Sequence, residues 1–292
     1  MRHEWRRRLW GRLQYVRARL ERVGNDVIRV RLTSIGAQFL GMEVDAFLVG
    51  DILVDTGFAY ARDPMLAALE QHRIQLICCT HSHEDHTGNC AAISSAHGCP
   101  VFLRHADTFW DEGIESLAPY RRIWWGEVEP FGACEMPEVV ESGGRRLEVI
   151  PTPGHARTQV AFFESATGDV FTGDLVTSHR ASAILTWGNP WQEVESLRRV
   201  AALEPRRMLT GHGLIEEHPA PLLQRKADLI ESAARQSVEL MSSGLDPRAV
   251  VRTVFPKGVA KDRFLERLTS REFSRLNFVL AAVRHAPRRP GA

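Results

Sequence analysis

The 292-residue sequence predicts an α/β fold in which two β-sheets pack together, helices flank them, and a helical region is appended at the C-terminus. Short apolar runs with β-type patterning occupy two separate stretches of the chain, and segments with helical periodicity lie between the runs. From residue 221 onward the pattern is helical almost to the end. Strand-rich halves with intervening helices are typical of layered α/β domains.

The N-terminal segment is basic and amphipathic. Residues 1–22 contain eight Arg and two Glu, so the rest of the chain carries a net charge of −5. We expect a helix over residues 4–22, because apolar side chains recur there at helical spacing: Trp5, Leu9, Leu13, Val16 and Leu20. Residues 1–22 would contact a membrane surface or an anionic partner, dock on the chain's own domain, or form a poorly ordered extension.

The first β-rich stretch begins after this segment. We expect strands over residues 27–32, 46–49, 52–55, 74–80 and 101–104, with helices over 64–72 and 89–97. Residues 107–137 show no clean period and carry several aromatic side chains, among them Trp110, Tyr120, Trp124, Trp125 and Phe131. This segment is interpreted either as an irregular cover over a pocket or as satellite core packing.

The β pattern resumes beyond this segment. Strands are expected over residues 147–151, 160–164, 170–172 and 207–210, and helices over 191–203, 221–242, 246–254, 262–268 and 270–284. The expected division is a basic helix over 1–25, a main domain over 26–218, a helical region over 219–286 and a disordered tail over 287–292.

Composition limits the class of protein. An apolar content of 44% with 25% charged residues is ordinary for a soluble globular enzyme. No apolar run approaches the roughly 18 residues that a transmembrane helix needs, so we expect none. Five cysteines without C-x-x-C spacing favour a reduced, cytoplasmic protein: Cys78, Cys79, Cys90, Cys99 and Cys134. The mildly acidic body favours a small-molecule substrate over nucleic acid, and nothing indicates an oligomeric state.

One hexapeptide carries most of the functional signal. His81, His83, Asp85 and His86 place four potential metal ligands within six residues, directly after an apolar run. Side chains alternate along a strand, so His81 and His83 can point the same way. Asp85 and His86 lie past the expected strand end and can turn toward a second ion.

Three more potential ligands follow apolar runs, each beside a glycine: His155, Asp174 and His212. Any one of them alone is more often a hydrogen-bonded turn residue. Together with the hexapeptide they make five His and two Asp, a set suited to borderline metals such as zinc.

On these motifs, together with Asp55-Thr56-Gly57, the chain resembles the metallo-β-lactamase-fold superfamily over about residues 27–215. The resemblance implies a four-layer αβ/βα sandwich with a dinuclear centre at one edge. It assigns one ion to His81, His83 and His155, and the other to Asp85, His86 and His212. It also makes Asp174 the bridging ligand, and Asp55 a residue that orients its neighbours without binding metal.

The resemblance also implies a metal-dependent hydrolase. A hydroxide shared by two divalent ions would cleave a small-molecule ester, thioester or lactone, with Asp85 and Asp174 in the catalytic centre. Zinc is the expected metal, with iron and manganese left open. The alternative activity is that of a phosphodiesterase or ribonuclease of the same superfamily.

The substrate is less clearly indicated. The C-terminal helices are similar in placement to those of β-lactamase-like thioesterases. The Gly/Cys-rich segment with an Arg-Phe pair that follows the bridging Asp in hydroxyacylglutathione hydrolases is absent here. His179, Arg180 and Trp187 are candidate substrate contacts, although His179 and Arg180 also fit an ordinary surface pair.

Overall fold

The computed structural model describes residues 11, 13–24, 27–39, 42–106, 118–177, 183–257 and 259–287. The chain forms two compact units. The first comprises residues 1–150, 158–177 and 206–217, and the second comprises residues 151–157, 178–205 and 218–292.

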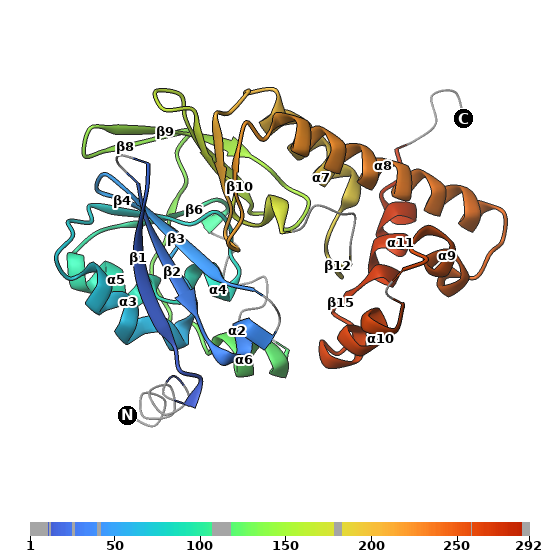
Figure 1. Cartoon of the computed structure of the whole chain (residues 1–292), viewed down its shortest axis with the longest axis horizontal. Helices are drawn as coiled ribbons and strands as arrows, with labels where there is room; N and C mark the ends of the chain where they lie inside the picture. The colour runs from blue at the N-terminus through green and yellow to red at the C-terminus, as the bar shows by residue number, and fades with distance from the viewer. Residues whose placement is uncertain are drawn as a thin grey trace. The chain divides into compact units, whose positions relative to one another are not determined.

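A seven-stranded sheet organises the N-terminal part of the first unit (Figure 1). Its strands follow one another in chain order, antiparallel from β1 to β4 and parallel from β4 to β7. They are β1 (Arg17–Val23), β2 (Val27–Thr33), β3 (Val44–Val49), β4 (Ile52–Val54), β5 (Leu76–Cys78), β6 (Val101–Leu103) and β7 (Cys134–Glu135).

Short helices connect and cover these strands. They are α2 (Ile35–Phe39), η1 (Ala59–Ala61), α3 (Arg62–Leu69), α4 (Glu84–Thr87), α5 (Cys90–His97) and α6 (Pro119–Trp125). One hydrophobic core lies between this sheet and its helices, where Met65 and Leu69 of α3 and Ile93 of α5 pack with strand residues such as Leu53 and Ile77.

A six-stranded sheet completes the first unit, with the order β14-β13-β11-β10-β9-β8. Its strands are β8 (Val139–Ser142), β9 (Arg145–Pro151), β10 (Val160–Glu164), β11 (Asp169–Phe171), β13 (Arg207–Leu209) and β14 (Ile215–Glu217), and η4 (Gly173–Val176) follows β11. A second core joins the two sheets, with Phe47 packed against Phe171 at a ring-centroid distance of 5.3 Å. The expected two-sheet α/β architecture is therefore confirmed.

The second unit is mainly helical. It contains β12 (Ile184–Leu185), α7 (Pro190–Ala201), α8 (Ala220–Ser242), α9 (Pro247–Val254), α10 (Val259–Leu268), β15 (Phe273–Ser274) and α11 (Arg275–Arg284). Asn189, Asp246 and Ser274 cap α7, α9 and α11 through their side chains. Among the described residues, no helix is both long enough and apolar enough to cross a membrane.

The expected N-terminal helix is wrong over residues 17–23. These residues form β1, which pairs with β2 from Arg17↔Thr33 to Val23↔Val27. The segment also alternates in period two, with Val16, Ala18 and Leu20 separated by charged residues, and pairing with a buried neighbour favours that pattern over the helical one. Residues 1–10 lie outside the described part of the chain, as do residues 288–292 of the expected tail.

Two further expectations need correction. The helix expected over 270–284 begins only at Arg275, because residues 273–274 pair with β12 and Ser274 caps α11. The segment 107–137 contains α6, and residues 107–117 lie outside the described residues. Trp125 packs in the core with its ring 5.4 Å from that of Phe58, so core packing is the correct interpretation for this tryptophan.

Candidate metal centre

Strand ends bring the predicted ligands together. β4 and β5 are parallel neighbours, so Asp55 and the hexapeptide emerge at the same edge of their sheet. β11 and β13 are parallel neighbours in the other sheet, and Asp174 and His212 follow them. The loops and short helical turns that follow these strands therefore carry all of these side chains on a rigid scaffold.

The hexapeptide adopts a loop followed by one helical turn. β5 ends at Cys78, so His81 and His83 lie in a loop, and the expectation that strand alternation orients them is wrong. They still converge, with His81 Nε2 lying 3.0 Å from His83 Nδ1. α4 then presents Asp85 and His86, both buried.

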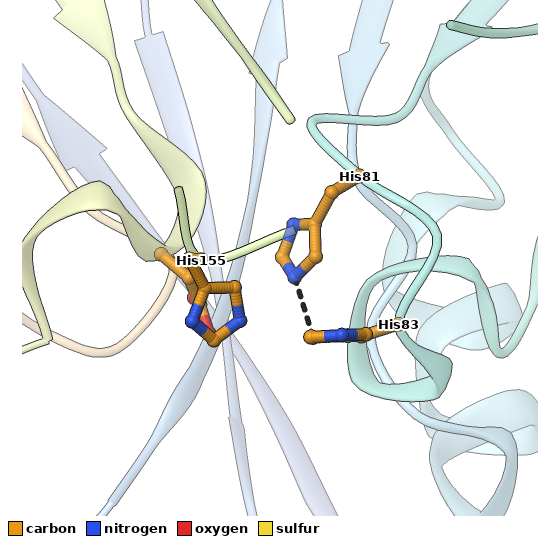
Figure 2. Close-up of side chains that lie close together, drawn as sticks. His81, His83 and His155 are labelled. Carbon is orange, nitrogen blue, oxygen red and sulfur yellow. Dashed lines mark hydrogen bonds between the residues drawn. The ribbon is translucent and has the colours of Figure 1, made fainter. Parts of the chain in front are cut away.

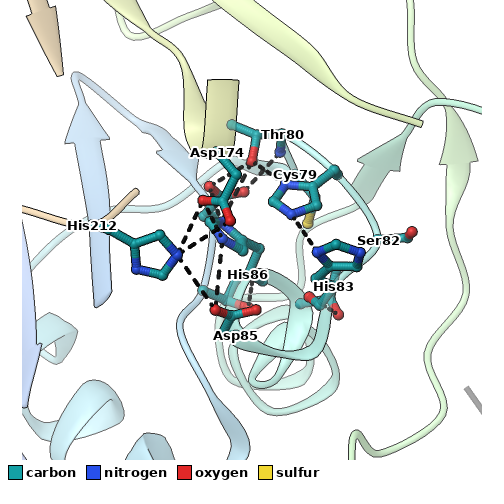
Figure 3. A network of polar contacts seen from close by, with 12 residues as sticks. Cys79, Thr80, Ser82, His83, Asp85, His86, Asp174 and His212 are labelled. Atoms are coloured by element: carbon teal, nitrogen blue, oxygen red, sulfur yellow. Dashed lines mark hydrogen bonds and ion pairs between the residues drawn. The ribbon is translucent and has the colours of Figure 1, made fainter. Parts of the chain in front are cut away.

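The seven predicted ligands gather into two groups. One ligand atom from each of His81, His83, His155 and Asp174 lies within 4.8 Å of the others, and the three histidines are drawn in Figure 2. The same holds for Asp85, His86 and His212, which Figure 3 shows beside Asp174.

Asp174 also lies against the second group. Its Oδ1 is 3.1 Å from His212 Nε2 and 3.2 Å from His86 Nε2. Asp85 Oδ2 lies 3.6 Å from His212 Nε2 and 4.0 Å from His86 Nε2. Two atoms bound to one tetrahedral zinc ion at about 2.0–2.1 Å are about 3.4 Å apart, so this spacing suits a shared cation.

A buried carboxylate orients His86. Asp55 Oδ2 lies 2.8 Å from His86 Nδ1 and accepts a hydrogen bond from the Thr80 hydroxyl at 2.8 Å. The Thr80 backbone N–H donates to Asp55 Oδ1 at 2.7 Å. With Nδ1 donating to Asp55, the other ring nitrogen of His86 is left as the metal-facing acceptor.

That ring nitrogen provides the test of whether a metal fits. His86 Nε2 is fully buried and has no well-aligned hydrogen-bond partner among the described groups, although Asp174 Oδ1 lies 3.2 Å away. A buried polar atom without a hydrogen bond is costly in a folded protein, and a metal ion would satisfy it. Imidazoles and carboxylates are also the ligands that zinc and related divalent metals prefer. The donor set therefore fits a divalent metal centre.

The turn that carries His212 is held from both sides. His212 Nδ1 lies 2.7 Å from the Glu43 carbonyl oxygen, so its Nε2 faces Asp174 and Asp85. The Asp45 backbone N–H donates to the Gly211 carbonyl at 2.8 Å. The Asp45 side chain accepts from the Gly213 N–H at 2.9 Å.

Asp45 is itself neutralised. Its Oδ2 lies 2.8 Å from Arg29 Nη2, and both side chains are buried. Burial raises the pKa of Asp45, while the Arg29 guanidinium lowers it, and the net shift is upward. Removing either Asp45 or Arg29 would therefore destabilise the fold, because the remaining charge would be buried without a partner.

A second buried ion pair supports α4. Arg121 of α6 binds both carboxylate oxygens of Glu84, with Nη2 2.7 Å from Oε2. Glu84 directly precedes Asp85, so the ion pair with Arg121 fixes the start of the helical turn that presents two predicted ligands. Burial raises the pKa of Glu84, Arg121 lowers it and Asp85 raises it, and the net shift is upward.

Two glycines are required by close packing at the centre. A Cβ at Gly211 would lie 2.6 Å from His86 Cε1 and 3.1 Å from Asp174 Oδ1. Gly173 has φ +49°, and a Cβ there would lie 2.5 Å from the Thr80 hydroxyl oxygen. Each of these glycines precedes a predicted ligand, and neither site has room for a side chain.

Carboxylates shift the proton affinity of the buried histidines. Burial lowers the pKa of His86, but Asp55, Asp174 and Asp85 raise it, and the net value lies well above 6.5. Burial also lowers the pKa of His212, yet Asp174 and Asp85 raise it to about 9. The two histidines in turn hold the pKa of Asp174 well below its ordinary value, against the effect of burial. Protons and cations therefore compete for the same nitrogens.

The three expected substrate contacts stay a prediction. His179 and Arg180 lie outside the described residues. Trp187 is 48% exposed in the turn after β12. Sequence reasoning missed Asp45 and Arg121, and the one available signal was a lone carboxylate within the apolar run of β3.

Comparison with known proteins adds a family. The sequence profile of the Metallo-beta-lactamase superfamily matches residues 41–212. A hydroxyacylglutathione hydrolase from Albidiferax ferrireducens is 31% identical over 167 residues, or 55% of this chain and 57% of that protein. An atrochrysone carboxyl ACP thioesterase from Aspergillus fumigatus is 26% identical over 63% of this chain and 54% of its own length. The chain thus spans about half the length of the curated relatives it matches.

A solved structure shares the fold. A metallo-beta-lactamase family protein from Thermus thermophilus superimposes with a TM-score of 0.60 at 22% identity, covering 82% of this chain and 87% of the other. The profile match extends over more than half of the chain and includes all seven clustered His and Asp residues. The chain therefore belongs to the metallo-β-lactamase superfamily, as the sequence predicted.

Proposed function

We propose that this protein is a dinuclear metal-dependent hydrolase whose first substrate class to test is a small-molecule thioester. The observation that carries the proposal is a cluster of six ligand-type side chains in the first unit, of which His83 and His212 are half-buried and the others buried: His81, His83, Asp85, His86, Asp174 and His212. His155 joins them through its nearness to His81 and His83.

Each ion has its own proposed ligands. His81, His83 and His155 would hold one ion, and Asp85, His86 and His212 the other. Asp174 is proposed to bind both, which is supported by its membership of the first group and its distances of 3.1 and 3.2 Å to His212 and His86. When bound, two divalent ions would polarise a scissile carbonyl and acidify a water molecule.

The chain's own residues have two tasks in this proposal. Asp55 keeps His86 in the tautomer whose Nε2 faces the centre, and the Glu43 carbonyl does the same for His212. The His86 side chain is fully buried and the His212 side chain is only 4% exposed, which keeps bulk water away from the ligand nitrogens and strengthens every electrostatic contact made there. Asp85 and Asp174 supply the negative charge that offsets the cations.

The thioester preference is supported by the names of the relatives. One is called a hydroxyacylglutathione hydrolase and another a carboxyl ACP thioesterase. Esters and lactones share the same carbonyl chemistry and belong in the same panel. We also propose zinc as the metal and a cytoplasmic location, the latter supported by five free cysteines.

The test uses the full chain loaded with zinc and assayed on acyl thioesters, esters, lactones, β-lactams and phosphodiesters. Thioester turnover should disappear in Asp85→Ala and persist in the control Asp228→Ala, which removes a carboxylate that is 67% exposed on α8. Metal analysis of both variants accompanies the assay. Undiminished turnover by Asp85→Ala would refute the proposed mechanism, and cleavage of phosphodiesters alone would replace the substrate class.

A further inference from the structure

A second charged site lies in the helical unit. Among the described residues, one pocket is lined by four guanidinium groups and a single carboxylate: Arg248, Arg252, Arg263, Arg275 and Glu266. Ser274 and two aliphatic side chains complete its lining. The residues come from α9, α10, β15 and the start of α11, which belong to the same unit (Figure 1).

Two of the four guanidinium groups are fixed in place. Arg248 Nη2 lies 2.9 Å from Glu266 Oε1. Arg275 donates to the carbonyl oxygens of Phe255 and Lys257, and its guanidinium carbon lies 5.1 Å from the centroid of the Phe255 ring. These contacts hold two positive groups in defined positions, and the carbonyls and the ring that position Arg275 are uncharged.

The other two guanidinium groups reach solvent. Arg252 and Arg263 are exposed, and neither forms an ion pair with any side chain that the structure describes. Four guanidinium groups and one carboxylate leave the pocket a formal charge of +3. Like charges that line one pocket repel each other, so an anion bound between them would remove an unfavourable interaction.

We propose that this pocket binds the phosphate or pyrophosphate group of a small molecule. Guanidinium groups match phosphate oxygens in a two-pronged geometry. A phosphate monoester carries about −1.5 to −2 at neutral pH, whereas a carboxylate carries only −1, so phosphate offsets the charge of +3 better. None of the lining residues is a predicted metal ligand, and this inference does not depend on the proposed hydrolase activity.

The experiment titrates inorganic phosphate into the metal-loaded full chain by calorimetry, in a Tris buffer free of sulfate. We expect saturable binding that weakens about tenfold or more in the double variant Arg252→Gln/Arg263→Gln. Arg267→Gln is the matched control, because Arg267 is exposed on α10 but does not line the pocket. It should bind phosphate like the unmodified chain.

Three outcomes would overturn the proposal. The first is no binding at phosphate concentrations on the order of tens of millimolar, well above the range of a specific site. The second is unchanged binding by the double variant, which would place the phosphate outside this pocket. The third is that the unmodified chain binds RNA in a salt-sensitive way but does not bind free phosphate, and that the double variant loses the RNA binding. This result would indicate a polyanion-binding surface.

The double variant also separates this proposal from the function proposed above. Arg252 and Arg263 are not predicted metal ligands, so hydrolysis of an uncharged thioester should be the same in the double variant and the unmodified chain. A protein that binds phosphate but hydrolyses nothing would leave the pocket assignment intact. Circular dichroism of the double variant verifies that the helical unit is folded.

Discussion

Metal uptake by the apo chain should release protons and strengthen steeply with pH. The pKa of His212 is raised to about 9 because Asp174 and Asp85 outweigh the effect of burial. At pH 7 about 99% of such histidines carry a proton that a metal ion must displace. The pKa of His86 is also raised well above 6.5, so a second proton has to leave its ring.

The magnitude follows from these two histidines. His212 alone makes the apparent affinity of the Asp85–His86–His212 group rise about tenfold per pH unit between pH 7 and 9. If His86 releases a second proton, the apparent affinity rises by as much as about a hundredfold per pH unit while both rings are charged. Zinc binding measured by calorimetry in buffers of different ionisation enthalpy reports the number of protons released.

The control separates the two histidines from the rest of the chain. His212→Gln should lower the proton release by about one, whereas His285→Gln, at an exposed position after α11, should leave it unchanged. Zinc affinity that is independent of pH between 7 and 9, with no proton released, would refute the electrostatic reasoning.

The same shift predicts how the stability of the apo chain depends on pH. The folded-state pKa of His212 exceeds its ordinary value of 6.5, so its contribution is fully present below pH 6.5 and is lost as the pH rises through about 9. At about 1.36 kcal/mol per pKa unit, the loss is at most roughly 3 kcal/mol. Thermal unfolding of the apo chain between pH 6.5 and 9.5 measures it, and zinc should reverse the trend.

Three substitutions test the support around the centre. Asp45→Ala removes the side-chain oxygen that accepts from the Gly213 N–H, while the backbone bond from Asp45 to Gly211 remains. Chelator competition should therefore show zinc binding about 10- to 100-fold weaker at the Asp85–His86–His212 group, with Asp45→Asn recovering part of it. Gly211→Ala would press a methyl group onto His86, so metal analysis should find the second ion missing. Arg121→Met would leave the buried Glu84 carboxylate unpaired and should lower the free energy of unfolding, measured with urea, by about 3–5 kcal/mol. An unchanged urea midpoint would contradict this.

Local chemistry explains what the sequence could predict. The hexapeptide and the glycines next to Asp174 and His212 encode ligand type and turn geometry within a few residues. Parallel strand pairing then gathers these turns at the edges of the two sheets. The predicted ligands could therefore be found without knowing which strands are neighbours.

Long-range pairing explains what the sequence could not predict. The segment 17–23 fits both a helix and a strand, and only its partner β2 decides between them. Arg121 is separated from Glu84 by 37 positions, and Asp45 from Gly213 by 168. No local pattern marks these residues as partners, because their pairing exists only once the strands have been assembled.

The contact between Asp45 and the His212 turn joins the two halves of the sandwich. Asp45 belongs to β3 of the seven-stranded sheet, whereas the turn it holds follows β13 of the six-stranded sheet. If the six-stranded sheet slid against the seven-stranded sheet, His212 would move away from Asp85 and His86, which stay with the seven-stranded sheet. Retention of metal in this group is thus a direct reporter of whether the N- and C-terminal halves of the first unit are correctly docked. A chelator should loosen the sandwich as well as stop any chemistry.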